Sequence, residues 1–193
     1  FDEMLTGYRF SRGGAMSFYD VYPDMATFGK GIANGMPIGI VLGHEKFMSH
    51  FDKVFLSSTY GGECLTLAAT KAGLDYHQKH DVVKHLWDIG SIVLNGFKEK
   101  IEFYELENHV KAIGFPVRQT LSFKDHHGNP DFNMAGLFQQ TMLEEGVLCN
   151  AGLGFCHSHT PKEANYIVNS FDKALHNIKE GIEKGKLENM LRG

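Results

Sequence analysis

The chain has 193 residues, of which 42% are hydrophobic and 22% are charged, and this composition excludes disordered and fibrous proteins. Its formal net charge of −4 provides no basic surface for nucleic acid. The longest apolar run, Met36 to Leu42, is too short to cross a bilayer. We therefore expect a soluble protein with neither a nucleic-acid nor a membrane partner. The cysteines (Cys64, Cys149 and Cys156) contain no C-x-x-C pair, which favours a reducing compartment and a cytoplasmic location.

The first part of the chain, from residue 1 to about 79, is rich in glycine and contains short apolar pieces such as Ile38 to Leu42. This pattern is typical of buried strands joined by loops that form sites. A run of good helix formers predicts a helix from about Glu63 to His77. Because the chain opens on Phe1-Asp2-Glu3, we expect residues 1–79 to be the remnant of a large α/β domain in a fragment of a longer protein.

The second part, from about residue 80 to 193, begins with apolar residues at three- and four-residue steps. They predict a long amphipathic helix that starts near Asp81. Val117 to Phe123 then alternates between apolar and polar residues, which indicates a half-exposed strand. The sequence His127-Gly128-Asn129-Pro130 predicts a turn after it.

The rest of this part predicts two further helices. One covers roughly Asn133 to Glu145 and ends at Gly146, and Val147 to Cys149 resembles a short strand. Thr160-Pro161-Lys162-Glu163 combines a capping box with proline at the first helical position, which predicts the start of the final helix. Residues 80–193 therefore read as a smaller α+β domain.

Three residues in the first part have the chemistry needed to hold pyridoxal 5′-phosphate (PLP). Asp2, at a strand end, suits the pyridine nitrogen, because a carboxylate stabilises the protonated ring. Lys30 lies between two glycines, where a bulky cofactor can approach and form a Schiff base with the amine. Thr59 precedes two glycines and the predicted helix, so its hydroxyl and nearby backbone amides suit a phosphate. Short motifs of this kind have high false-positive rates, and a glycine-flanked lysine is more often an ordinary loop residue.

The amino-acid sequences of three longer segments are more specific than these short motifs. The stretches FDEMLTGYRFSRGGA, PDMATFGKGIANGMPIGIVLG and STYGGECLTLAATKAGL together resemble class III aminotransferases of the fold type I PLP enzymes, most closely the glutamate-1-semialdehyde 2,1-aminomutase-like branch. The resemblance implies a fragment of the fold type I large domain followed by a small domain. It also implies that Asp2 and Lys30 are catalytic, and that Thr59 binds the phosphate of the cofactor in the neighbouring subunit of a homodimer.

Two positions depart from the pattern of that family. Met4 stands where the family usually has a valine packed against the cofactor ring, and we expect it to fill the same space. Glu63-Cys64 replaces the usual Asn-Pro after the threonine loop. Glu63 would bring a negative charge near the substrate entrance.

Several alternatives stay open. Within the PLP interpretation, the substrate is a small-molecule amino donor or acceptor, and the enzyme is either an aminomutase or an aminotransferase for another amino compound, as in polysaccharide biosynthesis. A truncated fragment that only binds a partner or dimerises is a non-catalytic alternative. A nucleoside triphosphatase is disfavoured, because no Ser or Thr follows Lys30. The pair His157 and His159 lacks a third metal ligand in its pattern, so no metal site is predicted.

Overall fold

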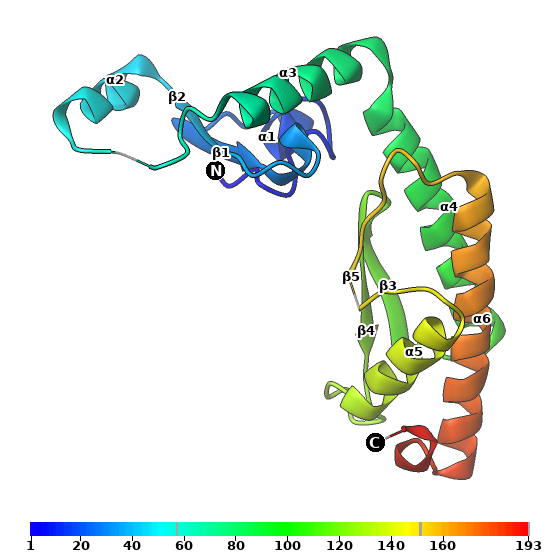
Figure 1. Ribbon diagram of the computed structural model, residues 1–193. Helices are drawn as coiled ribbons and strands as arrows, with labels where there is room; N and C mark the ends of the chain where they lie inside the picture. The colour runs from blue at the N-terminus through cyan, green and yellow to red at the C-terminus, as the bar shows by residue number, and fades with distance from the viewer. Residues whose placement is uncertain (57, 151, 193) are drawn as a thin grey trace. The chain divides into compact units, whose positions relative to one another are not determined.

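The computed structural model describes residues 1–56, 58–150 and 152–192. By internal contacts the chain divides into two compact units, Phe1–Lys84 (unit 1) and His85–Gly193 (unit 2). Both combine helices with sheet (Figure 1). Among the described residues, no helix is both long and apolar enough to span a bilayer.

The sheet of unit 1 is built on one antiparallel pair. Strand β1 (Met25–Gly29) pairs with β2 (Gly39–Gly43) from Met25 opposite Gly43 to Gly29 opposite Gly39. On the other edge of β1, Asp2 forms a parallel bridge with Thr27. The backbone bonds from Glu3 N to Thr27 O (2.8 Å) and from Thr27 N to Phe1 O (2.9 Å) hold that bridge. The apolar segment Ile38 to Leu42 is thus confirmed as a strand, β2, shifted by one residue. The expectation that this strand is buried is wrong, because Val41 and Leu42 are 40% and 54% exposed.

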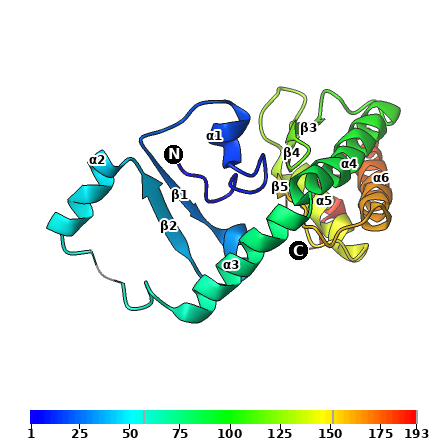
Figure 2. The same cartoon turned by 90° about the horizontal axis from the view of Figure 1, so that it is seen from above.

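Helices cover this small sheet. They are α1 (Gly14–Phe18), the 3₁₀ turns η1 (Lys30–Ala33) and η2 (Ser49–Lys53), α2 (Glu45–Met48) and α3 (Cys64–Lys79). Helix α3 confirms the helix predicted from Glu63 and passes beside β1 and η1 in both views (Figures 1 and 2). A β-carbon on Gly73 would lie 2.7 Å from the carbonyl oxygen of Ile32, so glycine is what allows this close packing.

Unit 2 contains a three-stranded antiparallel sheet in the order β3-β4-β5. Its strands are β3 (Val110–Phe115), β4 (Arg118–Phe123) and β5 (Gly152–Leu153). The alternation predicted for Val117 to Phe123 is confirmed, because its apolar-side residues, including Gln119, are all buried.

The short strand predicted over Val147 to Cys149 is wrong. The amide of Val147 donates to the carbonyl of Met142 at the end of α5 (2.8 Å), and the side chain of Leu148 is 90% exposed. This segment therefore closes the preceding helix, and among the described residues the pairing with β4 is formed by Gly152 and Leu153.

The helices of unit 2 follow the predicted pattern. They are α4 (Val82–Phe103, in unit 2 from His85 on), α5 (Phe132–Glu144), α6 (Pro161–Lys184) and the turn η3 (Glu188–Met190). The capping box of Thr160 and Glu163 is present at the start of α6. Gly146 has the positive φ (78°) predicted for the residue that ends α5. Helices α4 and α6 lie side by side (Figure 1), where a β-carbon on Gly96 would touch Val168.

Candidate active site

Unit 1 contains a pocket of about 820 Å³ near the carboxyl end of β1. Its walls come from the start of β2, from the loop before α3 and from the first turn of α3. The described lining residues are Met4, Lys30, Met36, Pro37, Ile38, Gly39, Ile40, Ser58, Thr59, Tyr60, Gly61, Glu63, Thr66 and Leu67. The pocket therefore combines an apolar floor with two charged side chains, those of Lys30 and Glu63.

Lys30 is the first residue after β1, and its backbone has φ of 50°. A side chain with a β-carbon rarely adopts this left-handed conformation, which costs on the order of 1–3 kcal/mol. The strained turn places an exposed lysine in the wall of the pocket. Strain of this kind concentrates at functional positions, so the geometry makes Lys30 a candidate for chemistry.

Asp2 and Met4 lie next to the end of β1. Asp2 is bridged to Thr27, three residues before Lys30, and its Oδ1 accepts a hydrogen bond from the amide of Met4 (2.9 Å). Asp2 is not part of the described lining of the pocket, whereas Met4 is. The thioether of Met4 packs over Gly29, since a β-carbon there would lie 2.5 Å from Met4 Cε.

Thr59 lies in the loop between η2 and α3, and it is exposed. The loop is held by hydrogen bonds from Gly61 N to Ser58 O and from Glu63 N to Tyr60 O, both 3.2 Å. Thr59 lines the same pocket as Lys30 within one chain. The structure thus brings together Lys30, Thr59 and Met4, with Asp2 bonded to the Met4 backbone.

The pocket has room for a bulky ligand beside Lys30. A β-carbon on Gly31, the neighbour of Lys30, or on Gly39 in the wall would have no heavy atom within 4 Å. The absence of side chains at these positions leaves open space next to the amine. An apolar floor with a few polar groups is the usual character of a small-molecule site.

The family model described as "Aminotransferase class-III" matches residues 1–161 of the sequence. The chain belongs to the class III aminotransferase family. The match covers all of unit 1, with the pocket, and most of unit 2.

Curated relatives of this class III chain include several aminomutases. A glutamate-1-semialdehyde 2,1-aminomutase from Halorubrum lacusprofundi is 39% identical over an alignment of 215 residues. The alignment covers 91% of this chain and 48% of the relative. An enzyme of the same name from Methanosphaera stadtmanae is 27% identical over 187 residues (90% and 44%). A 2'-deamino-2'-hydroxyneamine transaminase from Streptomyces kanamyceticus is 29% identical over 175 residues (90% and 43%). The chain thus spans less than half the length of these relatives.

Solved structures show the same fold. The FumI protein of Sphingopyxis sp. MTA144, described as a PLP internal aldimine form, superposes with a TM-score of 0.86 at 21% identity. The superposition covers 94% of this chain and 43% of the FumI chain. A structure described as a transaminase with PLP bound gives a TM-score of 0.78 at 23% identity, over 93% and 44% of the two chains.

Glu63 of the class III chain caps helix α3. Its Oε1 accepts the amide of Leu65 and its Oε2 accepts the amide of Thr66, both at 2.7 Å. Hydrogen bonds from Thr66 and Leu65 lower the pKa of the Glu63 carboxyl below its usual value. Because these two amides are already bonded, they are not available to a phosphate. Phosphate binding on this side would depend on Thr59 and the amides of its loop.

Glu3 is a buried carboxylate of unit 1, with 1% of its surface exposed. It accepts the amides of Ala15 (2.8 Å) and Met16 (2.7 Å) in α1, and a hydrogen bond from the Thr6 hydroxyl. Gly14, with φ of 78°, leaves the space that this carboxylate fills. Glu3 anchors the backbone between Asp2 and Met4, a structural role that its sequence neighbours do not reveal.

His157 and His159, considered above as possible metal ligands, contact neighbouring residues of unit 2. His159 Nδ1 accepts the amide of Cys156 (3.0 Å), and its carbonyl oxygen contacts His85 Nε2 at 2.8 Å. The ring of His157 packs on that of His85, with centroids 4.7 Å apart. Over the described ranges, no three His, Cys, Asp or Glu side chains are arranged to hold a metal ion.

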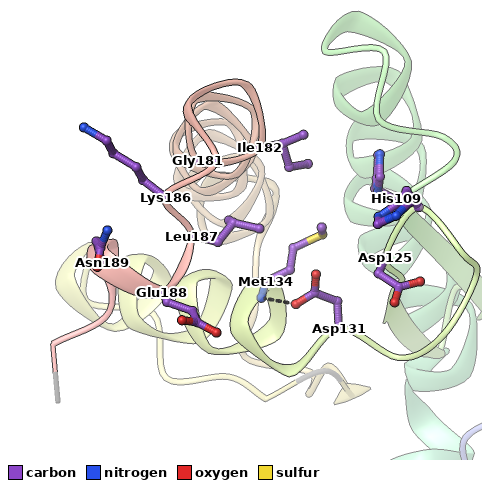
Figure 3. Close-up of a pocket in the computed structure, with 12 residues that line it drawn as sticks. His109, Asp125, Asp131, Met134, Gly181, Ile182, Lys186, Leu187, Glu188 and Asn189 are labelled. Atoms are coloured by element: carbon purple, nitrogen blue, oxygen red, sulfur yellow. Dashed lines mark hydrogen bonds between the residues drawn. The ribbon is translucent and has the colours of Figure 1, made fainter.

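A second pocket, of about 410 Å³, lies in unit 2 between the start of α5 and the end of α6 (Figure 3). Two of its acidic groups, Asp131 and Asp125, serve the backbone, and the third, Glu188, accepts a hydrogen bond from the Asn133 side chain (3.2 Å). Asp131 Oδ1 caps α5 by accepting the amide of Met134 (2.8 Å), and Asp125 Oδ1 accepts the amides of His127 and Asn129. These groups are therefore explained by the turn and by the helix start.

Proposed function

We propose that the full-length protein transfers amino groups with PLP as its cofactor, and that Lys30 holds this cofactor through Nζ. The observation that carries the proposal is the strained Lys30 in the wall of a pocket of about 820 Å³. Family membership supports it. The open space beside Gly31 and Gly39 supports it as well, because no side chain blocks the approach of a ligand there.

Bound PLP supplies a ring that accepts electrons from the substrate carbon. The Asp2 carboxylate would keep a proton on the pyridine nitrogen through its opposite charge. The Lys30 amine, when neutral, would move a proton to and from the substrate carbon. Met4 would pack against the ring, and the Thr59 hydroxyl would donate to a phosphate oxygen.

The substrate proposed is a small amino compound. Among the relatives named above, two are aminomutases and one is a transaminase named for 2'-deamino-2'-hydroxyneamine. We keep both candidates, an aminomutase of the glutamate-1-semialdehyde type and an aminotransferase for another amino compound. In the described residues Cys64, Cys149 and Cys156 are free thiols, which supports the proposal of a cytoplasmic location.

Chemical trapping on the full-length protein tests the role of Lys30. Borohydride reduction after addition of PLP is expected to fix the cofactor on the peptide that contains Lys30, identified by mass spectrometry. Lys30→Ala should lose this label, whereas Lys46→Ala, which removes an exposed lysine of α2, should keep it. A label distributed over other lysines would contradict the proposal. Labelling without conversion of any amine would favour the non-catalytic alternative.

We also propose a homodimer in which Thr59 serves the cofactor of the neighbouring subunit. Mixed dimers of Lys30→Ala and Thr59→Ala subunits test it. If Thr59 acts across the dimer, both changes fall on one site of each mixed dimer, and the other site stays intact. If it acts within its own chain, each site of the mixed dimer carries one defect, and activity stays as low as in the parent variants.

A further inference from the structure

The pocket of unit 1 has an uneven distribution of charge. Among its described lining residues, Lys30 and Glu63 are charged, and most of the others are apolar or carry hydroxyl groups. Once the amine of Lys30 is engaged by the cofactor, Glu63 is the charged residue of the described lining that remains for a substrate. In the proposed homodimer this is the substrate of whichever subunit the Thr59 loop serves.

The Glu63 carboxylate is held in a fixed position. Each of its oxygens accepts one backbone amide at 2.7 Å, from Leu65 and from Thr66. The Thr66 hydroxyl also bonds to this carboxyl. Since a carboxylate has about four lone-pair directions on its two oxygens, one remains for a further donor from the pocket. Because the side chain is already ordered, a bound group would lose little affinity to the ordering of Glu63.

Helix capping alone does not explain a glutamate at this position. Ser, Thr, Asp and Asn are the preferred N-cap residues, and this chain uses Asp131 to cap α5 and Thr160 to cap α6. The side chains of Asp131 and Thr160 each accept one amide of their helix, which is the usual extent of an N-cap bond. Glutamate adds a longer reach and, relative to Asn, Ser or Thr, a full negative charge in the pocket wall.

We propose that Glu63 selects substrates, favouring amines that carry a second cationic group over amines that carry a distal carboxylate. One amino group of a diamine or of a multiply aminated sugar reacts beside Lys30, and the second pairs with the Glu63 carboxylate. This inference rests on the proposed amino-transfer function, and it assigns the substrate class that the family match leaves open.

Kinetics on the full-length protein loaded with PLP provide the first test. Conversion of the bound cofactor by 1,4-diaminobutane and 1,6-diaminohexane is compared with conversion by 1-aminobutane and by 4-aminobutanoate. Wild type should prefer the diamines. In Glu63→Gln, the ratio of kcat/KM for diamine over 1-aminobutane should fall about tenfold, since a hydrogen bond between charged groups is lost.

Two matched variants separate charge from capping. Glu63→Asn keeps a good N-cap residue without the charge, and it should lose the same selectivity as Glu63→Gln. Glu163→Gln alters an acid of unit 2, in the first turn of α6, that is not among the described lining residues of the pocket, and it should keep the wild-type ratio. An unchanged ratio in both Glu63 variants would overturn the inference.

Binding of an unreactive dication gives a readout that does not depend on turnover. N,N,N′,N′-tetramethyl-1,6-hexanediamine has no primary amine, and calorimetry should show about tenfold weaker binding to Glu63→Gln than to wild type. Equal binding would overturn the inference. If no amine converts the cofactor in wild type, the proposed function fails, and calorimetry still decides the role of Glu63 by itself.

Discussion

The two units of the chain are stabilised by different means. Unit 2 packs large aromatic rings at its centre, where Phe97 stacks on Phe171 with centroids 3.8 Å apart and both are fully buried. The buried cluster of unit 1 is small and consists of Ala26, Phe28, Ile32 and Ala33. Its loops depend on the buried carboxylate of Glu3 and contain the strained Lys30. The unit with the smaller core thus carries the proposed chemistry, and the unit with the larger core supplies stability.

The largest expected effect is on activity. Lys30→Gly in the full-length protein should lower the rate of amine conversion by about 10³-fold or more, because the proton-transferring amine is lost. The same change should raise the stability of unit 1 by about 1 kcal/mol, since glycine adopts a positive φ without strain.

Unfolding and single-turnover kinetics on one preparation measure both quantities. Lys30→Ala is the matched control, because it removes the amine but keeps a β-carbon in the left-handed conformation. A stability gain in Lys30→Ala as large as that in Lys30→Gly would contradict the assignment of strain.

The next effect concerns the aromatic core of unit 2. Phe171→Ala should destabilise the chain by about 3–5 kcal/mol, because the cavity cannot close between rigid neighbours. Phe132→Ala should change stability by less than about 0.5 kcal/mol, since that ring is 83% exposed. Denaturant unfolding followed by circular dichroism measures both. Similar losses for the two variants would remove the contrast between the units.

A smaller loss is expected at the polar anchor of unit 1. Glu3→Gln should cost about 1.5–3 kcal/mol, because its amide nitrogen cannot accept the hydrogen bonds that one carboxylate oxygen now accepts. Hydrogen exchange at Ala15 and Met16, whose amides bind Glu3, should accelerate in this variant. Glu45→Gln, at an exposed position, is the control. Protection unchanged at Ala15 and Met16 would show that Glu3 is not the anchor.

Sequence patterns predicted the helices of unit 2 well, because their apolar periodicity is long and their caps are local. Thr160 and Glu163 lie three residues apart and satisfy each other's backbone. Strand β5 contains only Gly152 and Leu153 and has too few residues to show alternation. The sequence instead predicted a strand at Val147, in a segment that closes helix α5 through the bond from the Val147 amide to the Met142 carbonyl.

The candidate site was partly predictable for a similar reason. Lys30 and Thr59 are identified by their flanking glycines and by resemblance, and the structure places both in one pocket. The burial of Glu3 depends on Ala15 and Met16, more than ten residues away, and no local pattern predicts such contacts. The hydrogen bonds that the Glu63 carboxylate accepts from two backbone amides likewise follow only from the position at which α3 starts.

The smallest expected effect is a pH dependence that both units share. The pKa of Glu63 is lowered mainly by its side-chain hydrogen bond with Thr66, and that of Glu163 mainly by its side-chain bond with Thr160. Since the folded pKa lies below the unfolded one, each cap contributes fully above the unfolded value of about 4.5. The contribution is lost as the pH falls through the lower, folded pKa.

Hydrogen exchange at the first turns of α3 and α6 between pH 7 and pH 3 measures this loss unit by unit. Glu63→Gln should flatten the acid dependence at Leu65 and Thr66 only, and Glu163→Gln should flatten it in the first turn of α6 only. If either variant flattened the acid dependence of exchange in both helices, the two units would not respond independently to pH. If neither did, capping by these carboxylates would contribute nothing to the acid sensitivity of either unit.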